Sequence, residues 1–414
     1  MQKFKWMYIA VSAIFLAACG DYLVEEVFAE LSVYQTLPIF TTVENYVLAP
    51  LEIDGRVHLG INFHVDTSPT SNQMEEFEAL AGQHSIFTNT IYLGEDLPEM
   101  WFWEMIARGR IPNVILQPTN ALSPFERMPL RELAQALGRF HTPMFLQIFP
   151  EARSHGYHPE YYTEFWRYAR EVFRVYAPQV ALVFSIYEGD VLDFLDFFPG
   201  NNYVDWVAIN HYVILENGTS FSEGAIGRLE AFYQIFNRYK PMMINFGISH
   251  FSTVNHMYHS LSTGSFLEEF YKEILERFPR VRAMIYMDIN FVEHPTNRNR
   301  TDNFSITDNQ IVLNYYLLAT QNPYFSRQAS ASTDLNETTQ LIRSTFQGIR
   351  WGNEIFLPHH FLLYDVKVAD RYLNQYLLPH RQEFMGQVFY HVDILESIGL
   401  QLEIYQNNVI ILSS

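Results

Sequence analysis

Residues 180–186 read VALVFSI and residues 206–211 read WVAINH, two short apolar runs rich in β-branched and aromatic side chains. An amphipathic stretch of helical length, residues 160–176, precedes the first run, and another, residues 222–239, follows the second. Alternation of this kind is typical of repeated βα units whose strands form a parallel sheet. This part of the chain therefore indicates an α/β fold.

The alternation continues on both sides. Further strands are predicted at residues 57–63, 86–92, 113–117, 144–149, 242–246 and 283–288, and further helices at residues 73–81, 98–107, 130–140 and 265–278. Eight strands over residues 55–325 predict a (β/α)8 TIM barrel, whose active site lies at the carboxyl ends of the strands. A doubly wound open sheet is the alternative, although no G-x-G-x-x-G motif follows the first strand to support a dinucleotide site.

The composition limits the classes of partner. The chain has 414 residues, of which 48% are hydrophobic, so it can bury a large core. Acidic residues outnumber basic ones 46 to 27, and the net charge is -19. A surface of that charge does not neutralise phosphates, so nucleic acid is excluded as a partner. With a single Cys the chain has no intrachain disulfide.

The first residues look like an export signal. Lys3 and Lys5 precede an apolar run too short to span a bilayer permanently. The segment ends Leu16-Ala17-Ala18-Cys19-Gly20, which resembles the bacterial lipoprotein box, in which the Cys thiol receives a lipid. The resemblance implies a signal peptide at residues 1–19, a lipidated Cys19, attachment to the membrane and an extracytoplasmic location in the cell envelope. The alternative is an ordinary signal peptide with an incidental Cys.

Polar residues gather just after the predicted strands, where a barrel has its active site. Aromatic residues lie among them, and flat rings beside carboxylates suit sugars, although any one ring can equally belong to the core. The candidate substrate-binding residues are His64, Arg153, His155, Glu188, His211, Tyr212, Tyr286 and Asp288.

Four stretches resemble one family. Residues 57–61 (VHLGI), 143–151 (PMFLQIFPE), 198–206 (FPGNNYVDW) and 240–247 (KPMMINFG) resemble, in order, segments of the β-mannanases of glycoside hydrolase family 26. The resemblance covers roughly residues 55–325, which is the segment predicted to form the barrel. Its most specific part is residues 198–206, which lead into the sixth strand. It implies a retaining glycosidase with one Glu after the fourth strand as acid/base and a second after the seventh as nucleophile.

The match is incomplete where the chemistry occurs. Glu151 occupies the acid/base position, but Gln147 stands where the family has Arg and Pro150 where it has His. The nucleophile position holds Asn245. A retaining glycosidase needs two carboxyl groups about 5 to 5.5 Å apart, and an amide does not form the glycosyl intermediate.

We therefore expect a degenerate barrel that binds a β-linked polysaccharide such as β-mannan. The alternative is an active endo-β-mannanase or related β-glycanase that uses Glu151 with a relocated carboxylate, and a further one is a misplaced register. The relocated carboxylate would be Glu188, Asp190, Asp205 or Asp288. No cofactor is predicted, and no metal, because His256 and His259 have no third ligand at a recognisable spacing.

The ends of the chain lie outside the barrel. Residues 20–54 are predicted to be a spacer, with an extra strand packed on the barrel as one option, and the polar residues 326–340 are predicted to be a linker. Residues 341–414 are predicted to form a small α+β module, with a strand, a helix ended by Gly399 and a hairpin turning at Asn407-Asn408. This end resembles the stalk module named after the copper amine oxidase N-terminal domain, and an α+β appendage without a binding role is the alternative.

Overall fold

The protein divides into two compact units, one of residues 43–342 and one of residues 1–42 with 343–414. The structure, a computed structural model, describes residues 34–62, 71–120, 123–190, 193–214, 222–249, 251–252, 257–292, 302–329, 337–366, 368, 373, 381–384, 386–393, 401–405 and 409–413.

The larger unit contains a closed barrel of eight parallel strands. In chain order they are β2 (Val57–Asn62), β3 (Ile86–Leu93), β4 (Ile111–Pro118), β5 (Met144–Ile148), β6 (Val180–Tyr187), β7 (Trp206–Ile214), β8 (Met242–Ser249) and β11 (Val281–Met287). Each strand pairs with the next, and β11 pairs with β2 from Ala283 opposite His58 to Met287 opposite Asn62. All eight predicted strands are confirmed, and the closed ring excludes the open sheet.

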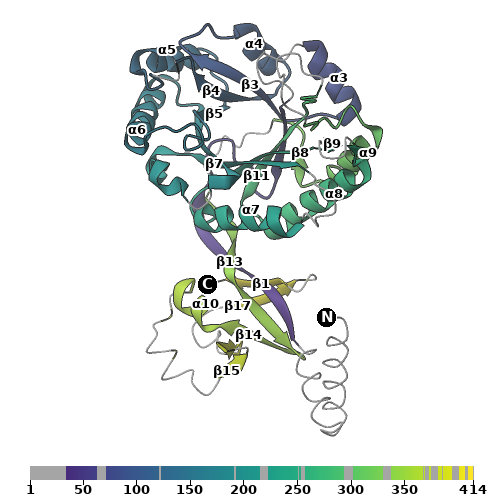
Figure 1. Cartoon of the computed structure of the whole chain (residues 1–414). Helices are drawn as coiled ribbons and strands as arrows, with labels where there is room; N and C mark the ends of the chain where they lie inside the picture. The colour runs from purple at the N-terminus through teal and green to yellow at the C-terminus, as the bar shows by residue number, and fades with distance from the viewer. Residues whose placement is uncertain are drawn as a thin grey trace, which may run out of the picture. The chain divides into compact units, whose positions relative to one another are not determined.

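Helices surround the strands (Figure 1). They are α3 (Ser71–Ala81), α4 (Glu99–Ala107), α5 (Arg127–Gly138), α6 (Pro159–Tyr176), α7 (Ser222–Phe236), α8 (Ser260–Arg277) and α9 (Gln310–Ala319), with single 3-10 turns η1 (Glu188–Asp190), η2 (Phe194–Phe197) and η3 (Asn201–Tyr203). The six predicted helices are confirmed, and α9 was not predicted. In α6 the buried residues recur every three or four positions, from Tyr162 to Phe173, because one face packs on the barrel.

Short strands complete this unit. β9 (Phe251–Ser252) and β10 (Met257–Tyr258) form an antiparallel pair, and β12 (Phe325–Ser326) adds to β2 beside the ring.

Alternate residues of each barrel strand face opposite sides. In β7, Trp206 and Ala208 belong to the core inside the barrel, whereas Val207 and Ile209 belong to the core beneath the helices. The period of two continues along the strand. It therefore places Asn210 on the inner side and His211 on the outer side.

Residues 46–52, predicted to be part of a spacer, instead close the amino-terminal end of the barrel. Leu51 packs inside the barrel with Ile86 and Trp206. Glu52 is 1% exposed and accepts a hydrogen bond from Arg280 at 2.6 Å. Such burial requires pairing, and the backbone amide of Ala49 gives the carboxylate a further donor at 3.0 Å.

The described part of the smaller unit includes a mixed sheet and the helix α10. Its elements are β1 (Tyr34–Val47), β13 (Glu337–Trp351), β14 (Glu354–Pro358), α10 (His359–Tyr364), β15 (Arg381–Phe384), β16 (Gln387–His391), β17 (Gln401–Tyr405) and β18 (Val409–Ser413). The strand order is β15-β16-β14-β13-β1-β18-β17, and β1 pairs in parallel with β18. Leu37 and Ile39 of β1 share a core with Phe361 of α10. The unit thus takes a strand from each end of the chain, including one that the sequence had placed in the spacer.

Candidate functional site

The mouth of the barrel is formed where the strands end, and Glu151 lies there directly after β5. Its backbone has φ of +60°, and Phe149 just before it has φ of +43°. Residues other than glycine rarely adopt this left-handed region, and such strain is concentrated at functional sites. The Glu151 amide donates to the Ser185 carbonyl of β6 at 3.1 Å. The chain therefore holds a half-buried carboxylate at the end of the strand in a costly conformation.

Amide side chains line the inner face next to Glu151. Asn210 of β7 donates from Nδ2 to Glu151 Oε1 at 2.5 Å. Asn245 of β8 donates from Nδ2 to Asn210 Oδ1 at 2.7 Å and to Gln147 Oε1 at 3.1 Å. We call Glu151, Asn210, Asn245, Gln147 and Asn113 together the amide network.

The amide network reaches across the barrel. Gln147 of β5 donates to Asn113 Oδ1 of β4 at 3.2 Å, and Asn113 donates to Thr88 Oγ1 of β3 at 2.9 Å. Its amides are buried, with Asn210 and Asn245 each 7% exposed. Apart from Glu151 every member is neutral, so the network orients one carboxylate and offers no second one.

Tyr187 at the end of β6 adds an aromatic face. Its side chain is 38% exposed. Burial raises the pKa of Tyr187, and the negative charges of Glu188 and Glu151 raise it further. The phenol is therefore protonated at neutral pH and sits close to the acidic residues of the mouth.

Glu188 and His211, both predicted to bind substrate, pair with each other on the helix side. Nδ1 of His211 contacts Glu188 Oε2, and Arg228 of α7 donates to the same oxygen at 3.0 Å. Burial acts to raise the pKa of Glu188, but the hydrogen bond from His211 and the charge of Arg228 outweigh it and leave the pKa lowered. This carboxylate is thus ionised, buried and engaged.

The ring of His211 stacks on Phe270 of α8 at 5.7 Å between centroids. Its Nε2 is buried and has no hydrogen-bond partner in the part of the chain that is described. These surroundings favour a packing role over contact with substrate.

Arg153 and His155 lie in the loop after β5. Arg153 pairs with Asp190 at 3.4 Å and Asp193 at 2.9 Å, and Ser154 donates to Asp190 at 2.9 Å. These contacts join the loops after β5 and β6. His155 is exposed and stacks on Tyr157 at 5.7 Å, so it remains accessible beside the mouth.

The three remaining described candidates differ in exposure. Tyr212 is half-buried and packs edge-on against Phe304. Tyr286 is fully buried, and its hydroxyl donates to the Phe304 carbonyl at 2.9 Å. Asp288 is 9% exposed and accepts from the Ile306 amide at 2.6 Å. Burial raises the pKa of Asp288, while hydrogen bonds from Thr307 oppose the rise. Tyr286 and Asp288 therefore support the loop before α9.

Asp205, the remaining carboxylate considered for a relocated mechanism, lies just before β7 at the amino-terminal end of the strands. It accepts from Arg170 at 2.6 Å and from the Leu182 amide at 2.9 Å. This engagement and position favour a structural role.

Several predictions fall outside the described residues. His64, Cys19, His256 and the hairpin turn at Asn407-Asn408 are among them. Within the described ranges no group of three or more His, Cys, Asp or Glu is placed to hold a metal ion. None of the helices described has both the length and the apolar character to cross a membrane.

The sequence analysis missed Asn210, which joins Glu151 to Asn245. The signal was present, since Asn210 follows Trp206 and Ala208 at intervals of two along β7. Selecting residues by their position after the strand gave His211 and Tyr212 instead.

Similarity to known proteins is confined to solved structures, since no protein-family model and no curated sequence matches the chain. A family 26 β-mannanase from Bacteroides ovatus, BoMan26A, is 12% identical, with a TM-score of 0.49 over 68% of this chain and 92% of its own. The protein GH26C from a Muricauda species is 11% identical, with a TM-score of 0.48 over 68% and 93%. An exo-β-1,4-mannosidase from an Opitutaceae bacterium is 13% identical, with a TM-score of 0.49 over 64% and 59%.

Proposed function

We propose that this protein binds a β-linked polysaccharide at the mouth of its barrel and does not hydrolyse it. The observation that carries the proposal is the environment of Asn245. Its amide donates to Asn210 and to Gln147, so the position expected for a nucleophile holds a neutral, buried donor. An amide neither offsets the charge of an oxocarbenium ion nor attacks the anomeric carbon.

The mouth keeps the features that suit a sugar. Glu151 and its Asn210 partner offer an acceptor and donors, and Tyr187 offers a partly exposed ring. Hydroxyl edges of a sugar bond to such groups, and its C–H face packs on an aromatic ring. The stretches that resemble family 26 mannanases support β-mannan as the first glycan to test.

The same proposal places the protein outside the cytoplasm, attached by a lipid on Cys19. Its support is the sequence around Cys19, the single cysteine of the chain. Incorporation of a radiolabelled fatty acid that is lost in Cys19→Ser tests this part. Labelling that survives the substitution contradicts it.

The binding test uses the chain from residue 20 onward with mannan, mixed-linkage glucan, xylan and purified cell wall. Affinity electrophoresis measures binding, and reducing-sugar release measures hydrolysis. We expect binding to at least one β-glycan without sugar release. Tyr187→Ala should weaken that binding about fivefold. A ring contact contributes about 1 kcal/mol, and an energy of that size corresponds to this change in affinity.

The matched control is Tyr324→Ala. Tyr324 is 58% exposed and precedes β12 at the opposite end of the barrel, so its loss should leave binding unchanged. Sugar release by the unmodified protein that disappears in Glu151→Gln would overturn the proposal in favour of an active hydrolase. Absence of binding to every glycan would overturn it as well.

A further inference from the structure

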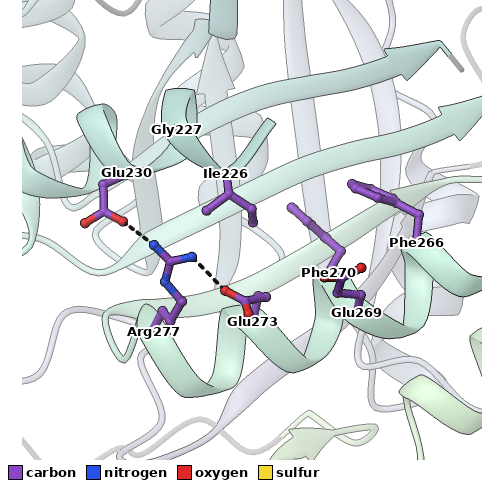
Figure 2. Close-up of a pocket in the computed structure, with 8 residues that line it drawn as sticks. All are labelled: Ile226, Gly227, Glu230, Phe266, Glu269, Phe270, Glu273 and Arg277. Carbon is purple, nitrogen blue, oxygen red and sulfur yellow. Dashed lines mark hydrogen bonds and ion pairs between the residues drawn. The ribbon is translucent and has the colours of Figure 1, made fainter. Parts of the chain in front are cut away.

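A cavity of about 430 Å³ lies on the outside of the barrel between α7 and α8 (Figure 2). It is built from these two helices, and none of its residues belongs to the amide network. Ile226, Phe266 and Phe270 form an apolar floor and are at most 7% exposed. Gly227 lines the cavity on the α7 side, and a Cβ atom there would have open space, with nothing within 4 Å. A volume of this size is within the range of small-molecule sites.

The rim of the cavity is acidic. Glu230 of α7 and Glu273 of α8 both pair with Arg277, at 3.0 and 2.8 Å. Figure 2 shows Arg277 between the two carboxylates, which fixes its guanidinium at one end. The third carboxylate is Glu269. It is exposed and has no hydrogen bond or ion pair to any residue that the structure describes.

The charges of the rim do not cancel. Three carboxylates face one guanidinium, and Arg277 is already shared by two of them. Glu269, one turn of helix before Glu273, therefore faces the cavity rim with its charge uncompensated. An apolar floor next to an uncompensated carboxylate is complementary to a cation with an apolar body.

We propose that this cavity binds an organic ammonium ion, a protonated amine that carries a small apolar or aromatic group. The ammonium group pairs with Glu269, and the apolar group covers Ile226 and Phe266. Anions are disfavoured by the rim and by the net charge of -19.

The test uses three probes that share a phenyl ring and are similar in size, with the purified full-length chain. Phenethylammonium carries the positive charge, phenethyl alcohol is neutral and phenylacetate is negative. Ligand-observed NMR titrations measure each affinity. We expect the ammonium to bind at least fivefold more tightly than the alcohol, phenylacetate not to bind, and the affinity of the ammonium to fall as salt is raised.

Two variants locate the binding. Glu269→Gln should weaken phenethylammonium binding at least fivefold, while Glu268→Gln removes the same charge from the neighbouring exposed position, which does not line the cavity, and should change it less than twofold. Gly227→Leu should abolish binding by filling the cavity. It replaces a helical glycine with a better helix former, so loss of folding is not expected.

Several results would overturn the proposal. They are equal binding of ammonium and alcohol, equal effects of the Glu269 and Glu268 substitutions, full binding in Gly227→Leu, and no binding of the ammonium at millimolar concentration. The glycan measurements do not depend on this cavity. Failure of either proposal therefore leaves the other to its own test.

Discussion

Lowering the pH should destabilise the barrel through His58, which lies fully buried on β2. Its Nε2 donates to the Leu51 carbonyl at 2.9 Å, and its Nδ1 lies 3.2 Å from Ser85 Oγ. Burial lowers the pKa of His58 from 6.5 to about 4, and the charge of Arg56 adds to the fall, although the bond to Leu51 opposes it. The native state therefore holds this imidazole neutral.

The size of the effect follows from the difference between the two pKa values. Because the folded pKa lies below the unfolded one, the contribution is complete above pH 6.5 and is lost as the pH falls towards 4. By pH 5 the loss amounts to about 2 kcal/mol, and it approaches about 3 kcal/mol at pH 4. Carboxylates add their own acid dependence, so the His58 contribution is measured as a difference between two proteins.

The assay is chemical unfolding at pH 7.5 and pH 5 for the unmodified chain and for His58→Gln. The substitution costs stability at both pH values, but we expect the variant to lose about 2 kcal/mol less between them. His84→Gln should behave alike, because burial lowers the pKa of His84 to about 3. Identical pH dependence in all three proteins would refute the argument that buried neutral imidazoles set this part of the acid response.

Two further pairs of substitutions, each with its control, test a buried ion pair and the packing around the barrel. Glu52→Gln removes the carboxylate that faces Arg280 and should reduce the free energy of unfolding by about 3 to 5 kcal/mol. Its control is Glu75→Gln, because the side chain of Glu75 pairs with Arg108 but is 63% exposed. That substitution should cost about 1 kcal/mol or less in the same denaturation assay. Gly138→Ala would place a Cβ atom 2.0 Å from the Tyr176 carbonyl oxygen and should cost about 1 to 3 kcal/mol, whereas Gly227→Ala meets no atom and should be neutral or stabilising by about 1 kcal/mol. Equal losses of stability in Glu52→Gln and Glu75→Gln would contradict the role given to burial of the ion pair. Equal losses in Gly138→Ala and Gly227→Ala would contradict the role given to the space around each glycine.

The strands and most helices of the barrel could be predicted from the sequence because their signals are local. A buried parallel strand is a short apolar run, and α6 shows a clear helical period. The helix α9 lacks such a period, because its ten residues are apolar on most sides. The helix begins after the Asn309 cap. The position of β1 was not predictable in this way, because its partner β18 is hundreds of residues away in the sequence.

The site was predicted in part. The stretches that resemble family 26 gave Glu151 and Asn245, which the amide network connects through Asn210. Choosing residues near the strand ends gave Tyr286 and His211, whose side chains pack beneath the helices. The two-residue period of a strand separates these groups, because one series faces the barrel interior and the other faces the helices. The hydrogen-bond directions within the network depend on contacts between strands and are not visible in the sequence.

Those directions determine what Asn245→Glu can restore. Asn245 donates to oxygens on both sides, Gln147 Oε1 and Asn210 Oδ1, and Asn210 also accepts from Ser185. A carboxylate at position 245 would face two acceptors, so either the neighbouring amides rotate or the new carboxyl group keeps its proton. Only the ionised form is a nucleophile. We therefore expect any sugar release by Asn245→Glu to be weak at neutral pH, to increase as the pH is raised, and to disappear when Glu151→Gln is added. Release that is strong at pH 6 and falls above it would show that the network reorganises freely around the new charge.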